Sequence, residues 1–304
     1  MSLSTGALSV DPLWPRAGSW PALASLPVGE AVDLAFVGLP TWRTSLSPTG
    51  AHATPAAVRA ALRRYSSHVP GLEVEALRFA DAGDVADPDG ADGEQRAIAT
   101  VREAAERSRL TVAVGGDNSL TVPAALGAWG EELPTAGLIT LDAHHDLRDG
   151  VSNGSPVRRL VEAGLDGRRI VQIGIADFAN SAAYAARAEE LGITVVPRDT
   201  LHRRPLDDVM REALEIAGAA GGPVHVDLDV DVCDRSVAPG CPASLPGGLA
   251  AWELRRFARL AGASPLVRSI DIAEVDATAD ADDQRTVRLA ALLVLEAAAG
   301  LASR

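Results

Sequence analysis

From about residue 32 onward, short apolar runs rich in β-branched residues alternate with longer segments in which Ala, Leu, Arg and Glu recur with a helical period. Strands buried on both faces form continuous apolar runs, and helices usually connect parallel strands. The pattern therefore predicts an α/β fold with a mainly parallel sheet between two helical layers. The eight expected strands are 32–37, 77–79, 110–114, 138–141, 170–175, 193–196, 224–230 and 267–272.

Between the expected strands, helices are predicted at 55–66, where Pro55 occupies the first turn, and at 95–108. Residues 1–30 are rich in Pro, Ser and Gly and are expected to form an irregular arm. The run DAGDVADPDGADGEQ is expected to be an acidic surface loop rather than a calcium site, because the ligand spacing of an EF-hand is missing. There is no internal repeat, and the length of 304 residues fits a single domain, 1–304.

The composition narrows the classes of partner. No apolar stretch reaches about 18 residues, and the N-terminus lacks a basic segment followed by an apolar core, so a cytoplasmic location is expected. The net charge of -13 opposes attraction to phosphate backbones or anionic lipid, so neither nucleic acid nor a membrane is an expected partner.

All basic residues are Arg, because the sequence contains no Lys. This excludes a Schiff base to a carbonyl compound or to pyridoxal phosphate, and it excludes a phosphate-loop lysine. The only cysteines, Cys233 and Cys241, are too few for a disulfide scaffold and are expected to be reduced thiols.

Polar residues follow four of the expected strands directly. The segments are GGDNS (115–119), DAHHD (142–146), DLDVDVCD (227–234) and DIAEVD (271–276). Parallel strands place their carboxyl ends at one edge of the sheet, so these segments are expected to converge. A pocket of five or more carboxylates needs cations, and oxygen ligands with one or two imidazoles favour Mn²⁺ over Zn²⁺. Taken singly, each segment could still be a turn with a helix cap, a polar loop or an acidic strand end.

The order of these segments resembles the ureohydrolase family of arginases, agmatinases and formiminoglutamases. The signatures of that family are GGDHS, DAHxD and DxDxxDP with PG several residues later, and here they read GGDNS, DAHHD and DVDVCDRSVAPG. Arg235 replaces the Pro of the third signature, and DIAEVD matches the late glutamate segment of the family. The resemblance runs from about residue 32 to the C-terminus and implies an arginase-like α/β/α fold with about eight strands.

The resemblance also implies a centre of two Mn²⁺ ions. Asp142 and Asp229 would bridge them. Asp146 and Asn118 would complete the shell of one ion, and the remaining ligands, His144 and Asp231, would complete that of the other.

The register of the third segment is ambiguous, because Asp227, Asp229 and Asp231 form two overlapping DxD pairs. Counting back from the PG pair selects Asp229 and Asp231, and strand alternation would place all three on one face. By the same alternation His145 points away from its neighbours and is expected to have an outer or structural role. The remaining histidines are expected to be ordinary core or surface residues: His52, His68, His202 and His225.

Two departures bear on the substrate. Asn118 stands where many ureohydrolases have a metal-binding His, and Asn153 stands where arginases and agmatinases have the His of a His-Gly pair. Formiminoglutamases resemble this chain in lacking the second His, in having Leu147-Arg148 after DAHxD, and in the C-terminal patterns at 271–274 and 285–290. The expected reaction is hydrolysis of N-formimino-L-glutamate to L-glutamate and formamide, as in histidine degradation.

In that reaction a hydroxide between the metals would attack the amidine carbon. Asp146 would pass a proton to the leaving amine, and Glu274 would orient the amidinium. Arg148 and Asn153 are the expected substrate-binding residues, although a surface salt bridge is an alternative role for Arg148. The other functions considered are an agmatinase, arginase or other guanidino-acid hydrolase, and a ureohydrolase-like protein that has lost catalysis. A homo-oligomer is expected.

Overall fold

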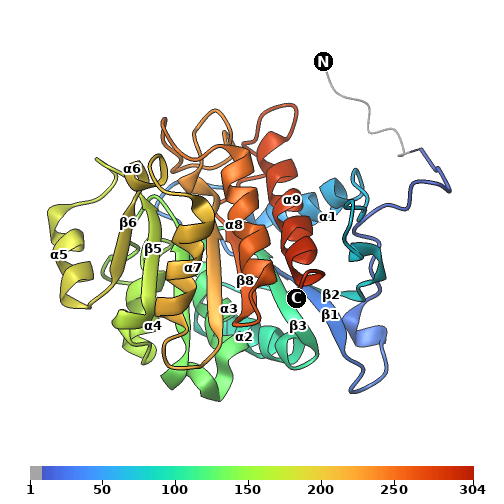
Figure 1. The fold of residues 1–304 in the computed structure, drawn as a ribbon, viewed down its shortest axis with the longest axis horizontal. Helices are drawn as coiled ribbons and strands as arrows, with labels where there is room; N and C mark the ends of the chain where they lie inside the picture. Colours follow the sequence, from blue (N-terminus) through green and yellow to red (C-terminus); the bar gives the residue numbers. More distant parts are fainter. Residues whose placement is uncertain (1–8) are drawn as a thin grey trace.

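The computed structural model describes residues 9–304, and within them eight strands form one sheet in the order β2-β1-β3-β8-β7-β4-β5-β6 (Figure 1). All seven neighbouring pairs are parallel, which confirms the predicted α/β class. The strands are β1 Val32–Leu39, β2 Phe79–Asp84, β3 Ser108–Gly115, β4 Gly137–Leu141, β5 Ile170–Ile175, β6 Thr194–Pro197, β7 Val224–Asp229 and β8 Val267–Ala273.

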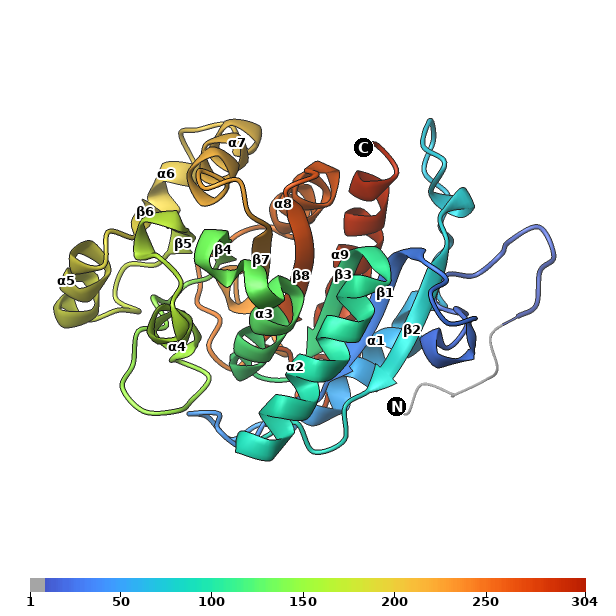
Figure 2. The same cartoon turned by 90° about the horizontal axis from the view of Figure 1, so that it is seen from below.

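Helices cover both faces of the sheet. One layer contains α7 (Leu206–Ala217), α8 (Ala251–Ala263) and α9 (Arg285–Leu301), with α1 (Thr54–Leu62) packed on α9. The opposite layer contains α2 (Ala91–Glu106), α3 (Thr121–Trp129) and α4 (Pro156–Ala163), as the view in Figure 2 shows. Near β6 lie α5 (Ala182–Glu190) and α6 (Arg198–Leu201). Among the described residues, no helix is both long and apolar enough to cross a membrane.

Seven short 3₁₀ turns complete the described elements, and two of them belong to the candidate site below. They are η1 Leu23–Ser25, η2 Ala51–Ala53, η3 Val74–Ala76, η4 Asn118–Leu120, η5 Gly130–Thr135, η6 Gly167–Arg169 and η7 Val230–Val232.

The acidic run at 81–95 is a loop only at residues 85–90, which shortens the loop expected from the sequence. Its first residues belong to β2, which was expected to end at residue 79, and its last residues open α2. The side chain of Arg59 contacts the carboxylates of both Asp81 and Asp84, and these contacts offset the charge along this edge strand. Pairing with β1 supplies the backbone hydrogen bonds that the weakly apolar sequence of β2 does not predict.

The N-terminal segment from residue 9 to residue 31 contains the turn η1 and neither a strand nor an α-helix. Trp20 holds it against the sheet by stacking on Phe79, with ring centroids 4.8 Å apart. The first eight residues of the expected arm lie outside the described residues.

The strand order brings the four polar segments together. β3, β8, β7 and β4 are consecutive neighbours in the middle of the sheet, and each is followed by one of the four segments singled out in the sequence. Because all strands are parallel, these segments emerge at the same edge. The four central strands therefore bring side chains as far apart in the sequence as Asn118 and Glu274 into one site.

Candidate metal centre

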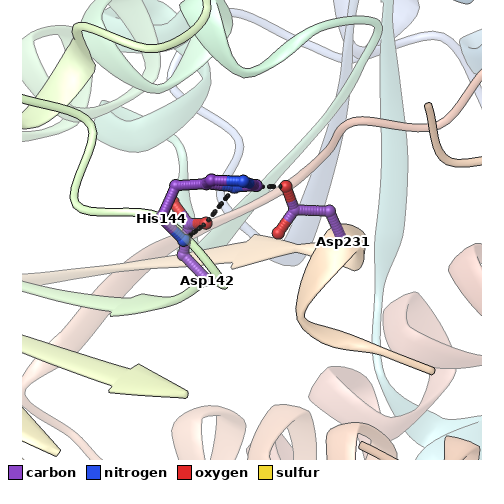
Figure 3. A group of neighbouring side chains, drawn as sticks. All are labelled: Asp142, His144 and Asp231. Atoms are coloured by element: carbon purple, nitrogen blue, oxygen red, sulfur yellow. Dashed lines mark hydrogen bonds and ion pairs between the residues drawn. The ribbon is translucent and has the colours of Figure 1, made fainter. Parts of the chain in front are cut away.

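Asp142, His144 and Asp231 form a close cluster of potential ligands (Figure 3). One ligand atom from each lies within 4.8 Å of the others. His144 Nδ1 is 2.7 Å from Asp231 Oδ2 and 3.5 Å from Asp142 Oδ1. Asp142 Oδ1 also accepts a hydrogen bond from the backbone N–H of His144 at 2.6 Å, which closes the turn after β4. The imidazole and the two carboxylates thus already face a common point.

Asp229 and Asp231 do not lie on one continuous strand, which corrects the alternation argument. β7 ends at Asp229, and the turn η7 then carries Asp231 into the site. Asp229 Oδ1 accepts from the backbone N–H of Asp231 at 2.7 Å, and Asp231 Oδ1 accepts from that of Ala143 at 3.1 Å. Asp229 therefore caps the turn that positions Asp231.

Asp146 and Asn118 meet on another side of the site. Asn118 Nδ2 donates to Asp146 Oδ2 at 2.6 Å, and Asn118 Oδ1 accepts from the hydroxyl of Thr121 at 2.7 Å. A hydroxyl can donate or accept, so the amide can turn over and present its oxygen to a cation while keeping the bond to Thr121. Asp146 has a positive φ of 53°, an uncommon conformation for a residue other than glycine.

Glu274 follows β8 and also has a positive φ, of 58°. Its Oε1 accepts two hydrogen bonds, from the backbone N–H of Asn118 at 2.8 Å and from Asn153 Nδ2 at 2.7 Å. These bonds fix the carboxylate beside the cluster. The four polar segments thus meet as the sequence predicts, and Asn153 joins them from a loop.

The electrostatics of the cluster fit a cation. Burial and the neighbouring Asp231 raise the pKa of Asp142 to about 7, and burial is also the main cause that raises the pKa of Asp146 and of Asp229. Burial alone would lower the pKa of His144, but Asp231 and Asp142 raise it to about 12. Asp142 Oδ2 is buried without a hydrogen-bond partner. Such a group of carboxylates needs positive charge, which a proton on His144 only partly supplies.

A cavity of about 240 Å³ opens beside these carboxylates. The acidic residues that line it are Asp146, Asp229, Asp231 and Glu274. Arg148 is also among the lining residues, and its backbone N–H donates to the carbonyl of Gly154 at 2.9 Å. Within residues 9–304 no ion pair involves the Arg148 guanidinium, which leaves it available to an anionic ligand.

His145 points away from the cavity. Its Nδ1 bonds Gln172 Oε1 at 2.7 Å, and Gln172 Nε2 donates to the His145 carbonyl at 2.8 Å. The buried ring fastens the DAHHD loop to β5. Of the other histidines, His225 is buried between Ser269 and Asp271, and His52, His68 and His202 are exposed.

We expect His145→Ala to keep kcat/KM within about tenfold of the wild-type value, because the ring supports the loop without facing the site. Some stability should be lost with the bond to Gln172, on the order of 1–3 kcal/mol. Steady-state kinetics and metal analysis check this. An inactive variant with an intact fold and normal metal content would show that the ring acts in catalysis.

Arg198 is a neighbour of the site that the sequence did not indicate. It is 9% exposed, and its Nη2 donates to the carbonyl of Val232 at 3.2 Å, next to Asp231. Burial lowers the pKa of Arg198, while the charge of Asp231 acts in the opposite direction. It begins a short helix with no motif of its own, so its role depends on the tertiary fold. The two cysteines are free thiols, as expected, and both are buried.

The raised pKa values of the acids predict how the metal-free protein responds to pH. The folded state holds protons on Asp142 and Glu274 up to pKa values of about 7 and about 8, whereas the unfolded acids lose them near 3.8 and 4.5. The folded state therefore binds more protons between these limits, and its stability falls as pH rises through this window. His144, whose pKa is raised from 6.5 to about 12, acts in the same direction above pH 6.5.

With a chelator present, we expect the Tm at pH 8 to lie roughly 5 °C or more below that at pH 5.5. Excess Mn²⁺ should reverse this order, because metal ligands bind in their deprotonated forms. Thermal unfolding followed by circular dichroism measures both effects. An equal or higher Tm at pH 8 in the chelated sample would contradict the assigned electrostatics.

Comparison with known proteins gives a consistent result. The model of the Arginase family matches residues 32–300. The chain is 34% identical over 279 residues to a formimidoylglutamase of Halalkalibacterium halodurans, which covers 88% of this chain and 87% of that protein. The crystal structure of formimidoylglutamase from Bacillus subtilis superposes with a TM-score of 0.89 at 30% identity, covering 99% and 96% of the two chains. That of Trypanosoma cruzi formiminoglutamase with Mn²⁺ superposes with a TM-score of 0.84 at 26% identity, covering 95% and 99%. The resemblance seen in the sequence motifs is thereby confirmed, and the chain belongs to the arginase family.

Proposed function

We propose that this protein is a manganese-dependent hydrolase of linear amidines that converts N-formimino-L-glutamate and water to L-glutamate and formamide. The observation that carries the proposal is the meeting of the Asp142–His144–Asp231 cluster with Glu274 and Arg148 around one cavity. This arrangement offers a cation site, an acceptor for an amidinium and a cation for a carboxylate. Relatives that match most of this chain at 30% identity or more include formimidoylglutamases.

The donor set fits Mn²⁺, because carboxylate oxygens dominate and only one imidazole faces the site. In this proposal His144 and Asp231 would hold one ion, Asp146 and Asn118 would hold a second, and Asp142 and Asp229 would contribute to both. The buried and unpartnered Oδ2 of Asp142 supports a shared role for that residue. When bound, Mn²⁺ lowers the pKa of a coordinated water and so makes hydroxide available near neutral pH.

The substrate is held at its two ends by opposite charges. Glu274 accepts an N–H of the cationic amidinium and turns the planar group toward the cluster, a charge-assisted contact in a buried setting. Arg148 lines the same cavity and binds a substrate carboxylate, for which its forked guanidinium is suited. Together these contacts select an acidic molecule with a terminal amidine.

Asp146 moves the proton. It is 7% exposed, lines the cavity and is held by Asn118, so its carboxylate is directed at the reacting group. It takes the proton of the attacking water and delivers it to the leaving amine, which departs as the amino group of glutamate. The C–O bond forms first by addition to the amidine carbon, and the C–N bond to the protonated amine of glutamate then breaks, which leaves formamide as the second product.

A panel of substrates tests the proposed function. The Mn²⁺-loaded protein is assayed with N-formimino-L-glutamate, arginine, agmatine and 4-guanidinobutyrate, and formamide and urea are quantified. We expect the highest kcat/KM with N-formimino-L-glutamate. Faster release of urea from a guanidino compound would replace the proposal by a guanidino-acid hydrolase, and no product from any of them would indicate a protein that has lost catalysis.

The weakest of the assigned ligands is Asn118, because an amide oxygen is a poorer donor than imidazole. We expect Asn118→His to raise the Mn²⁺ affinity of the site that includes Asp146 by roughly tenfold or more. The affinity of the site at His144 should not change. Calorimetric titration of metal-free wild-type and variant proteins with Mn²⁺ measures both affinities. Unchanged affinities at both sites would mean that residue 118 does not touch a metal.

A further inference from the structure

Both polar atoms of the Asn153 side chain make hydrogen bonds. Its Nδ2 donates to Glu274 Oε1 at 2.7 Å, and its Oδ1 accepts from the backbone N–H of Leu46 at 3.0 Å. A backbone N–H can only donate, so the atom facing Leu46 must be the amide oxygen, and the NH₂ group must face Glu274. Asn153 is therefore a cross-link between a loop and the carboxylate that receives the amidinium.

The loop that Asn153 contacts forms one wall of the cavity, because its residues Leu46 and Ser47 line that cavity. The backbone N–H of Asn153 donates to the carbonyl of Thr44 at 3.3 Å. At the far end of the loop, the backbone N–H of Gly50 donates to Asp276 Oδ2 at 2.7 Å. The wall is thus fixed at one end to Asn153 and at the other to the segment that carries Glu274.

The two bonds that Glu274 receives go to the same oxygen. Oε1 accepts from Asn153 and from the backbone N–H of Asn118, and within the described residues no hydrogen bond reaches Oε2. A carboxylate oxygen that already accepts two hydrogen bonds has little capacity left. Glu274 therefore presents one free oxygen to the cavity instead of two.

A single free oxygen distinguishes two kinds of substrate. A formimino group has one terminal nitrogen, and a hydrogen atom occupies the third position on its carbon. A guanidinium has two terminal NH₂ groups, and a buried N–H left without an acceptor is costly. Sites that leave such groups unpaired discriminate strongly against the compound that brings them.

We propose that Asn153 is a specificity-determining residue, which holds Glu274 in a one-oxygen contact and so favours formimino over guanidino substrates. The inference rests on the proposed function and goes beyond a direct contact between Asn153 and substrate. Asn153 is a positioning residue, because it acts on the substrate through Glu274.

The test uses a matched pair of substrates, N-formimino-L-glutamate and its guanidino analogue N-amidino-L-glutamate, which differ only in a hydrogen atom or an NH₂ group on the reacting carbon. Both are assayed with Mn²⁺-loaded wild-type protein, Asn153→Ala and Asn153→Asp. The aspartate keeps an acceptor for Leu46 and loses the N–H given to Glu274, so it separates the two ends of the cross-link.

We expect both variants to lower the ratio of kcat/KM for the formimino compound over the guanidino compound by about tenfold or more. A merely structural role would reduce both rates together and leave the ratio unchanged. Val151→Ala is the control, because this exposed residue of the same loop does not line the cavity, and it should retain the wild-type ratio.

The outcomes separate the two ideas. If wild-type protein prefers the formimino compound and Asn153→Asp keeps the wild-type ratio, the inference is overturned and the proposed function stands. If wild-type protein prefers the guanidino analogue, both the inference and the proposed function are wrong. A lowered ratio in both variants with an unchanged ratio in Val151→Ala supports the inference.

Discussion

Replacing Asp142 by alanine is expected to reduce kcat/KM by at least ~10³-fold and to remove most bound Mn²⁺, a larger loss than the 10–100-fold typical of residues that only support a ligand. Asp142 is fully buried, lies next to His144 and has one oxygen without a partner. In the proposed assignment Asp142 would be shared by both ions, so water could not replace it without exposing the remaining carboxylates to one another. Metal analysis and kinetics on the purified variant measure both losses.

The matched control is Asp149→Ala. Asp149 follows in the same loop, but its side chain is 81% exposed and pairs with Arg187 at the surface. We expect its activity and metal content to equal those of the wild type. Full turnover by folded Asp142→Ala would remove the two-metal assignment.

Asp146→Asn should lower kcat by about 10²–10⁴-fold, the range expected for loss of a positioned acid or base. Asparagine keeps the shape of the side chain and an oxygen for the metal but cannot carry the proton. We therefore expect the variant to bind at least one Mn²⁺ per chain and to keep a KM near the wild-type value. Single-turnover kinetics with saturating metal measure the chemical step. A kcat within tenfold of the wild-type value would show that another group moves the proton.

The sheet could be predicted from the sequence because buried parallel strands leave continuous apolar runs. The position predicted for β2 was wrong because its sequence, FADAGD, has little apolar character. The strand forms through pairing with β1 and the contacts of Arg59. Helix α1 ends at Leu62, four residues before the expected end. Both errors arise where tertiary contacts decide what local propensity leaves open.

The site was predictable to the extent that the strands place its residues. The strand ends locate Asp142, Asp229 and Glu274 at one edge, since the carboxyl ends of parallel strands coincide. The turn that carries Asp231, the cross-link through Asn153 and the buried Arg198 were not predicted as such. Loops have no hydrophobic period, so nothing in the sequence shows that Leu46 lies beside residue 153.

The most direct test of the account measures formamide released from N-formimino-L-glutamate by protein that has first been stripped of metal with a chelator. We predict no release above background before metal is added, and formamide and glutamate in equal amounts after Mn²⁺ is returned. Release at the full rate by the metal-free protein, or none by the Mn²⁺-loaded protein, would contradict the central claim that this cluster is the metal centre of an amidine hydrolase.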